Sequence, residues 1–115
     1  MEILIVGHDT ELADLTGKIL KRKGYDACSC RDISDAEKLI SRENVRLVIA
    51  DLETRQSERL QFCKSIKGME KPPKLLFIGR SGEEETIMLN AGADDWIQKP
   101  YKTAVFLART SALLR

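Results

Sequence analysis

The sequence lacks the features that mark several large classes of protein. No apolar run approaches the length that crosses a membrane, and no signal-peptide pattern is present. Acidic and basic residues nearly balance, with a net charge of +1, which argues against electrostatic capture of nucleic acid or of an anionic lipid surface. We therefore expect neither a nucleic-acid partner nor a membrane partner for this chain.

Histidine and cysteine are scarce. The one histidine is His8, and the three cysteines are odd in number, which with no signal peptide predicts a reducing, cytoplasmic location. Cys28 and Cys30 could supply two ligands of a metal site, but the sequence has no second cysteine or histidine pair to complete it. Alternation of side chains along a strand explains this spacing better.

A glycine-rich phosphate loop is also missing. The segment after the first apolar run, Gly7-His8-Asp9, lacks the glycine spacing of a dinucleotide site. A small flavodoxin-like protein that binds a nucleotide or flavin is therefore a disfavoured reading.

Apolar, strand-like runs alternate five times with amphipathic, helix-like stretches. The runs cover residues 2–6, 26–30, 47–51, 74–78 and 95–98. Successive apolar positions in the central runs are typical of strands covered on both faces. The sequence predicts one α/β domain over residues 1–115, a doubly wound five-stranded parallel sheet of flavodoxin-like type with helices on both faces.

Helix boundaries and buried stripes follow from the same pattern. Expected N-terminal caps are Asp9 or Thr10, Ser34 and Thr103, and the acidic residues 83–85 are placed to favour a helix dipole. We expect inward-facing apolar side chains at the following positions: Leu12, Leu15, Ile19 and Leu20 in the first helix, Ile87, Met88 and Ala91 in the fourth, and Val105, Phe106, Leu107 and Leu113 in the last.

One strand ends at a carboxylate. The apolar residues 47–50 run directly into Asp51, which would stand at the carboxyl edge of the sheet. In open parallel sheets, ligands and chemistry lie just beyond that edge. Asp51 is therefore the first candidate functional residue.

Three features in this order resemble one family. They are the strand that ends at Asp51, the string Gly-Ala-Asp-Asp-Trp-Ile-Gln-Lys-Pro at residues 92–100, and the arginine-bearing last helix at residues 107–115. Together they resemble the receiver domain of two-component response regulators, in particular the subfamily that carries a winged-helix DNA-binding domain. The resemblance covers the whole chain and implies bacterial signal transduction through a phosphorelay.

The resemblance assigns roles to four residues. It implies that Asp51 accepts a phosphoryl group, that Lys99 contacts the phosphoryl oxygens, and that the Lys99–Pro100 peptide is cis. It also places Trp96 at the aromatic switch position. Positioning and charge stabilisation dominate such phosphoryl transfer, so the activity expected is at most self-phosphorylation and dephosphorylation at Asp51.

The chain departs from the family pattern at the metal site. Gly7 and His8 stand where the resemblance places the acidic pair that holds Mg²⁺ with Asp51, and imidazole is a poor ligand for this hard cation. Asp9 and Glu53 are the substitute ligands available, although Asp9 suits helix capping better. Glu53 could instead pair with Arg55.

The switch and the neighbouring loop depart as well. Gly79 stands where a hydroxyl residue is expected, and Ser81 could replace it only through an unusual loop path. Arg55 and Arg59 replace the usual proline and glycine of the loop after Asp51. Without the hydroxyl, the coupling from phosphate to Trp96 is broken, which favours a fixed or partner-contacting Trp96 over a moving one.

Two readings of the function therefore stand side by side. In the first, the chain is an atypical, degenerate receiver, a protein-interaction module in which Asp51 is a structural carboxylate paired with Lys99. In the second, Asp51 is a working phosphoacceptor that takes phosphate from a histidine kinase with Mg²⁺ as cofactor.

The resemblance also implies partners. Asp95 and Arg109 match positions that form ion pairs between subunits, so we expect a homodimer through the fourth helix, fifth strand and fifth helix; the alternative is an ordinary surface pair. Arg115 falls where a linker to an effector domain would begin. We accordingly expect a C-terminal effector domain outside these residues.

Overall fold

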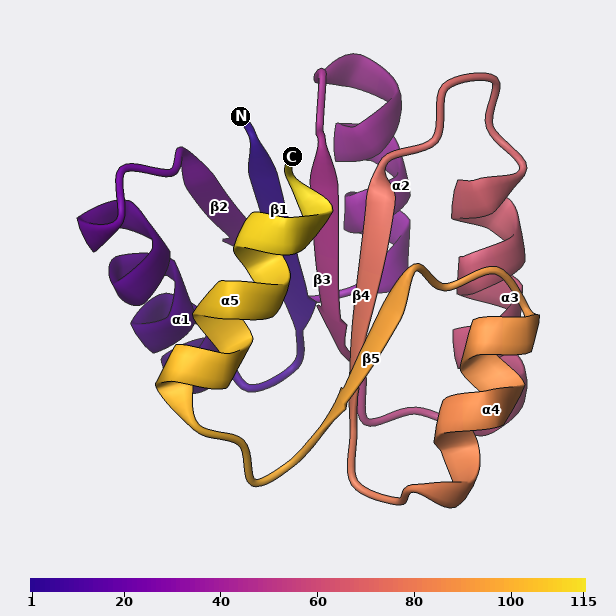
Figure 1. Ribbon diagram of the computed structural model, residues 1–115. Coiled ribbons are helices and arrows are strands. Elements are labelled where there is room, and N and C mark those ends of the chain that lie inside the picture. Colours follow the sequence, from indigo (N-terminus) through magenta and orange to yellow (C-terminus); the bar gives the residue numbers. More distant parts are fainter.

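The computed structural model describes residues 1–115 and has the predicted doubly wound architecture (Figure 1). Strands and helices alternate along the whole chain, and the five parallel strands lie in the order β2-β1-β3-β4-β5. None of the helices is both long and apolar enough to span a membrane. The elements are β1 (Ile3–Gly7), α1 (Thr10–Arg22), β2 (Ala27–Cys30), α2 (Ile33–Arg42), β3 (Leu47–Asp51), α3 (Gln56–Lys67), β4 (Lys74–Gly79), α4 (Glu83–Asn90), β5 (Asp95–Gln98) and α5 (Thr103–Leu113).

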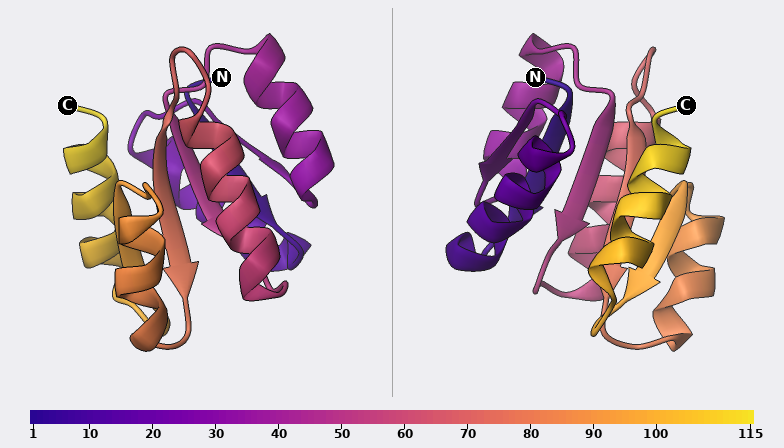
Figure 2. Two further views of the ribbon diagram at one scale, coloured as in Figure 1. Left: turned by 90° about the vertical axis from the view of Figure 1, so that its right-hand side faces the viewer. Right: turned by 60° about the vertical axis from the view of Figure 1, so that its left-hand side comes forward.

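Helices cover both faces of the sheet (Figure 2). Leu4, Val48 and Phe77 belong to a core cluster shared with α2, α3 and α4. Ile3, Ile49 and other alternate strand residues belong to a second cluster shared with α1 and α5. Because side chains alternate between the two faces, both sets of positions must be apolar. This is why the strands read as unbroken apolar runs.

Two of the expected helix caps differ in the structure. Asp9 does cap α1, since its Oδ1 accepts a hydrogen bond from Leu12 N at 3.1 Å. In α2, however, the cap is Asp32, whose Oδ1 accepts from Asp35 N at 2.8 Å, and not Ser34. In α5, Lys102 occupies the cap position without a side-chain hydrogen bond, so the cap expected at Thr103 is wrong.

Three apolar residues expected to face inward are exposed: Leu15, Ile87 and Val105. In α1 the buried stripe consists of Ala13, Thr16 and Leu20, which recur at helical spacing on one side of the helix. Leu15 then lies on the outer side of the helix. Hydrophobicity alone thus predicted a wider buried stripe than the packing uses.

Asp94, just before β5, connects the end of α3 and the start of β4 through hydrogen bonds. Its Oδ2 accepts hydrogen bonds from Leu75 N and from Lys67 Nζ, both at 2.8 Å, and Lys67 Nζ also donates to Pro73 O at 3.0 Å. Asp94 therefore joins the end of α3 to the start of β4. The residue string that carries the family resemblance includes it for a structural reason.

We expect Asp94→Ala to lower the free energy of unfolding by about 1–3 kcal/mol, because Leu75 N and the Lys67 ammonium lose their shared acceptor. Urea unfolding followed by circular dichroism measures this loss. The control is Asp26→Ala, which removes an exposed carboxylate 3.4 Å from the N-terminal amine and should cost under about 0.5 kcal/mol. Equal losses in both variants would contradict the role given to Asp94.

Candidate functional site

The carboxyl ends of the central strands bring the candidate residues to one edge of the sheet. Gly7 at the end of β1 lies in register with Asp51 at the end of β3. Lys99 follows β5, and its backbone N–H donates to Gly79 O at 2.7 Å, which continues the pairing with β4. The lysine is therefore fixed by the sheet itself.

Asp51 and Lys99 form an ion pair. Lys99 Nζ lies 2.6 Å from Asp51 Oδ2, and the side chains of Lys99 and Asp51 are 21% and 15% exposed. The peptide bond between Lys99 and Pro100 is cis, as the resemblance implied. The sequence thus predicted the two central residues, and the structure brings them into contact.

Tyr101 belongs to the same site. The pKa of the Tyr101 hydroxyl is raised, mainly by burial and to a smaller extent by the negative charge of Asp51. The ring stacks on Phe106 of α5, with centroids 5.5 Å apart. Tyr101 therefore remains a neutral phenol near the Asp51 carboxylate. Sequence analysis did not single it out.

The residues on the β1 side of Asp51 do not fit Mg²⁺. Gly7 carries no side chain, and a Cβ built there would lie 3.3 Å from Asp51 O. His8 is exposed, and the Asp9 carboxylate is used to cap α1. No group of three or more His, Cys, Asp or Glu side chains is close enough to hold a metal ion. The ligand set expected from Asp51, Asp9 and Glu53 is therefore not assembled.

Glu53 has a different partner from the one considered in the sequence. Its Oε1 accepts from the Arg80 guanidinium, across the gap between the β3–α3 and β4–α4 loops. Arg55 pairs instead with Glu58, at 3.0 Å, on the exposed side of α3. The Glu53–Arg55 pair, one of the two alternatives for Glu53, does not form, because each of the two side chains has another partner of opposite charge.

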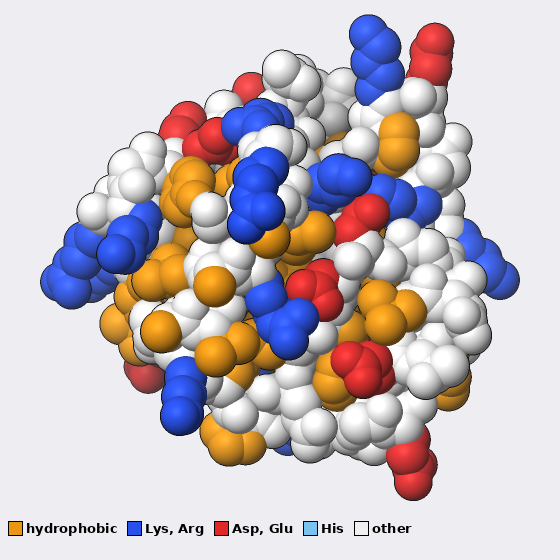
Figure 3. Space-filling view, viewed as in Figure 1, with side chains coloured by type: hydrophobic (Ala, Val, Ile, Leu, Met, Phe, Trp, Pro, Cys, Tyr) orange, Lys and Arg blue, Asp and Glu red, His pale blue; other side chains and the backbone are white.

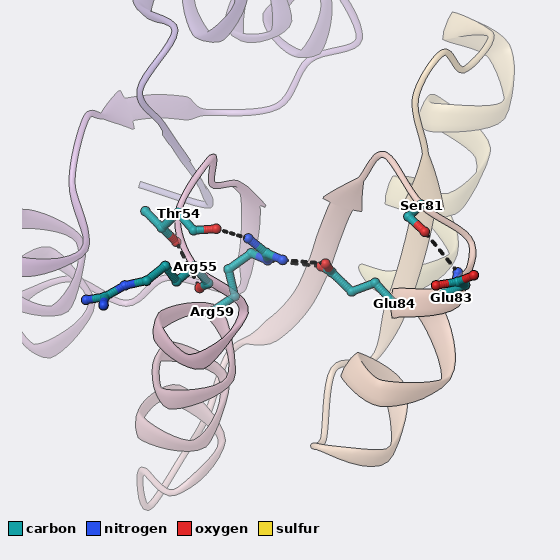
Figure 4. A network of polar contacts seen from close by, with 6 residues as sticks. All are labelled: Thr54, Arg55, Arg59, Ser81, Glu83 and Glu84. Carbon is teal, nitrogen blue, oxygen red and sulfur yellow. Dashed lines mark hydrogen bonds and ion pairs between the residues drawn. The ribbon is translucent and has the colours of Figure 1, made fainter.

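A cleft of about 230 Å³ opens beside Asp51. Its wall contains a second ion pair, between two helices, in which Arg59 of α3 binds Glu84 of α4 through two nitrogens (Figure 4). Sequence analysis noted Arg59 as a departure but found no partner, because Glu84 lies 25 residues further along the chain. The cleft is lined by Asp51, Leu52, Glu53, Arg59, Ile78, Gly79, Arg80, Ser81 and Glu84.

The indole ring of Trp96 packs directly against the Cα of Gly79, where a side chain would otherwise lie. A Cβ built on Gly79 would lie 2.5–2.8 Å from the Cζ2, Cε2 and Nε1 atoms of the indole, closer than real Cβ contacts. Trp96 is 3% exposed, and its Nε1 has no hydrogen-bond acceptor. The indole thus occupies the place of a side chain at position 79.

Ser81 lies in the cleft wall but does not replace the expected hydroxyl. Its Oγ accepts from Glu83 N at 3.4 Å, inside the turn that begins α4. This weak contact holds the loop. The structure brings Ser81 near the Asp51 cleft without directing it to Asp51.

Cys28 and Cys30 of β2 are free cysteines and belong to no group of three or more metal-ligating side chains. Burial, followed by the charges of Asp32 and Asp35, raises the pKa of Cys30 to about 11. The interpretation of Cys28 and Cys30 as ordinary strand residues agrees with this.

Asp95 and Arg109 meet within one chain. Arg109 Nη1 donates to Asp95 Oδ2 at 3.1 Å and to Oδ1 at 3.2 Å, on the surface formed by β5 and α5. A shallow groove beside the pair is lined by Ala104, Val105, Ala108 and Ala112. Figure 3 shows apolar, basic and acidic side chains mixed over this side of the molecule.

A doubly wound sheet with an aspartate at the end of its central strand, paired to a lysine before a cis proline, defines a signal receiver domain. The chain belongs to this family, because the sequence model described as "Response regulator receiver domain" matches residues 3–111. It is accordingly a receiver domain of two-component signalling.

Solved structures agree with this assignment. The chain is similar to HP1043, an orphan response regulator of H. pylori, with 30% identity, a TM-score of 0.87 and coverage of 100% of this chain and 97% of that one. It is also similar to the BeF3-activated receiver domain of Klebsiella pneumoniae RstA, with 26% identity, a TM-score of 0.90 and coverage of 100% and 99%. A receiver domain of a Syntrophus aciditrophicus histidine kinase shares 26% identity over 98% of this chain and 89% of that one, with a TM-score of 0.86.

We expect Gly79→Ser to destabilise the fold by about 1–3 kcal/mol, because its Cβ overlaps the indole of Trp96. In a Trp96→Phe background, Gly79→Ser should lower the free energy of unfolding by about 1 kcal/mol less than it does in the wild type, because the overlapping indole atoms are gone. Urea unfolding followed by circular dichroism gives both values.

The matched control for this cycle is Gly82→Ser in the same loop. A Cβ at Gly82 meets only Gln98 Oε1, at 3.4 Å, so little loss is expected. Additive effects of Gly79→Ser and Trp96→Phe would show that the two positions are not in steric conflict.

Proposed function

We propose that this chain is an atypical receiver that works mainly as a protein-interaction module, with an output conformation set by its own side chains. Mg²⁺-dependent phosphorylation of Asp51 is not what sets that conformation. Receiver domains interact with histidine kinases and effector domains. The partners proposed for this chain are of those two kinds, in the cytoplasm, where its three cysteines remain reduced.

The observation that carries the proposal is the packing of Trp96 on Gly79. The resemblance implies that a hydroxyl residue near Gly79 reports the phosphoryl group to the aromatic residue. Here no side chain exists to move, and the indole already fills the space. Trp96 is therefore fixed irrespective of the state of Asp51.

The charges around Asp51 support the same proposal. Lys99, Arg59 and Arg80 are each neutralised by an acidic side chain of the chain itself. Oxygen ligands are what Mg²⁺ prefers, and Gly7 and His8 supply none beside Asp51. The site holds its geometry by ion pairs where the family uses a metal.

A second candidate function is a working phosphoacceptor. Asp51 lines an open cleft and lies 2.6 Å from Lys99, the cation that would stabilise a transferred phosphoryl group. In that case the Asp51 carboxylate attacks the phosphorus of a donor, the donor's leaving group departs, and water later hydrolyses the acyl phosphate. A cation-assisted attack of this kind gives a slow reaction.

We also propose that two copies associate through α4, β5 and α5. Ile87 and Leu89 of α4 and Val105 of α5 are exposed apolar residues on this surface. The adjacent Asp95–Arg109 pair is exposed enough to exchange partners across a two-fold axis. The groove along α5 is lined by alanine and valine side chains, which a second copy bound there would bury.

We expect no mass gain when the chain is incubated with acetyl phosphate, with or without Mg²⁺, because the metal site lacks its acidic pair. Intact-mass spectrometry measures this directly. The control is Asp51→Ala under the same conditions. A Mg²⁺-dependent gain that disappears in Asp51→Ala would instead establish the phosphoacceptor reading.

We expect Val105→Glu to convert a dimer into a monomer in sedimentation velocity, because a carboxylate would be buried in the proposed interface. Leu15→Glu is the matched control, since Leu15 is also an exposed apolar residue but lies on α1. A monomeric wild-type chain, or dissociation caused by the α1 variant, would contradict this interface.

A further inference from the structure

The ion pair between Arg59 and Glu84 is more buried than any other in the chain, with side chains 14% and 13% exposed. Arg59 Nε donates to Glu84 Oε1 at 3.0 Å, and Nη2 donates to Oε2. Arg59 Nη1 donates to Thr54 O in the β3–α3 loop. One guanidinium thus joins the loop after Asp51, α3 and α4 (Figure 4).

Helix α4 is short and mostly exposed. It contains eight residues, and only Met88 is buried. Its N-terminal cap position is Gly82, which offers no side-chain hydrogen bond. A helix this short is not stable by itself in water, so its position depends on tertiary contacts. The ion pair supplies such a contact in the first turn.

The position of Glu84 links the cleft to the outer surface. Glu84 and Met88 are four residues apart and lie on the same side of α4, toward the core. Ile87 and Leu89 flank Met88 and are exposed. Any rotation or shift of α4 that Glu84 resists would also displace Ile87 and Leu89.

The strength of this pair differs from that of exposed ones. A two-nitrogen contact between guanidinium and carboxylate is strong and directional, and removing one partner leaves the other charge buried. The Arg55–Glu58 pair on the same helix α3 has side chains 84% and 42% exposed, where ion pairs contribute little. The two pairs therefore form a natural comparison.

We propose that Arg59 and Glu84 form a latch that holds α4 against α3 and thereby fixes the surface that carries Ile87 and Leu89. The latch uses two side chains of the chain and neither metal nor phosphate. It rests on the proposed function in one respect, that this surface is the output face. The device itself is a property of the folded chain.

The test is hydrogen–deuterium exchange of the backbone amides of α4 in Glu84→Gln, Arg59→Gln and the double variant. Each single variant should exchange about tenfold faster in α4, which corresponds to ~1.4 kcal/mol, while the β3 amides remain unchanged. The double variant should exchange no faster than the single ones, because both remove the same contact. Arg55→Gln, the matched control on α3, should leave α4 exchange within twofold of wild type.

Three outcomes would overturn the latch. They are α4 exchange in Glu84→Gln within twofold of wild type, additive effects in the double variant, and equal acceleration of α4 and β3. The last outcome would mean that the pair supports the whole fold and not the position of α4. Because the readout needs no phosphodonor, metal or dimer, failure of the proposed function would leave this result unaffected.

Discussion

Burial of the parallel sheet on both faces is the constraint on which the rest of the structure depends. Because β1, β3, β4 and β5 are covered by helices on each side, their polar positions are confined to the strand ends. Asp51, Gly79 and Lys99 therefore meet at one edge, although up to 48 positions separate them in the chain (from 51 to 99). The site follows from the topology, and its chemistry follows from which side chains occupy that edge.

Charge at this edge is balanced inside the chain. Asp51, Glu53 and Glu84 each contact one cation, namely Lys99, Arg80 and Arg59. Carboxylates crowded together repel one another and recruit a metal ion, whereas carboxylates paired one to one with lysine or arginine do not need one. The pairs also join different strands, loops and helices, so they support geometry as well as charge.

Local pattern and family resemblance predicted the strands, the sheet edge, the Asp51–Lys99 pair and the cap at Asp9. Each depends on residues near one another in sequence or on a motif of fixed order. The partners of Arg59 and Glu53 could not be predicted, because long side chains on different loops choose among several opposite charges within reach. Leu15 and Val105 were misplaced for another reason, since α1 and α5 bury narrow stripes that include Thr16 and Thr110 and leave these two apolar residues outside.

The contact between Gly79 and Trp96 has a consequence for how this sequence can change. A single substitution that places a hydroxyl residue at position 79 brings its Cβ into overlap with the indole of Trp96, so this substitution alone destabilises the protein. A smaller aromatic at position 96 removes the obstacle, and only then is a side chain at position 79 tolerated. The volume of the indole therefore sets the order of the two substitutions: position 96 has to change before position 79.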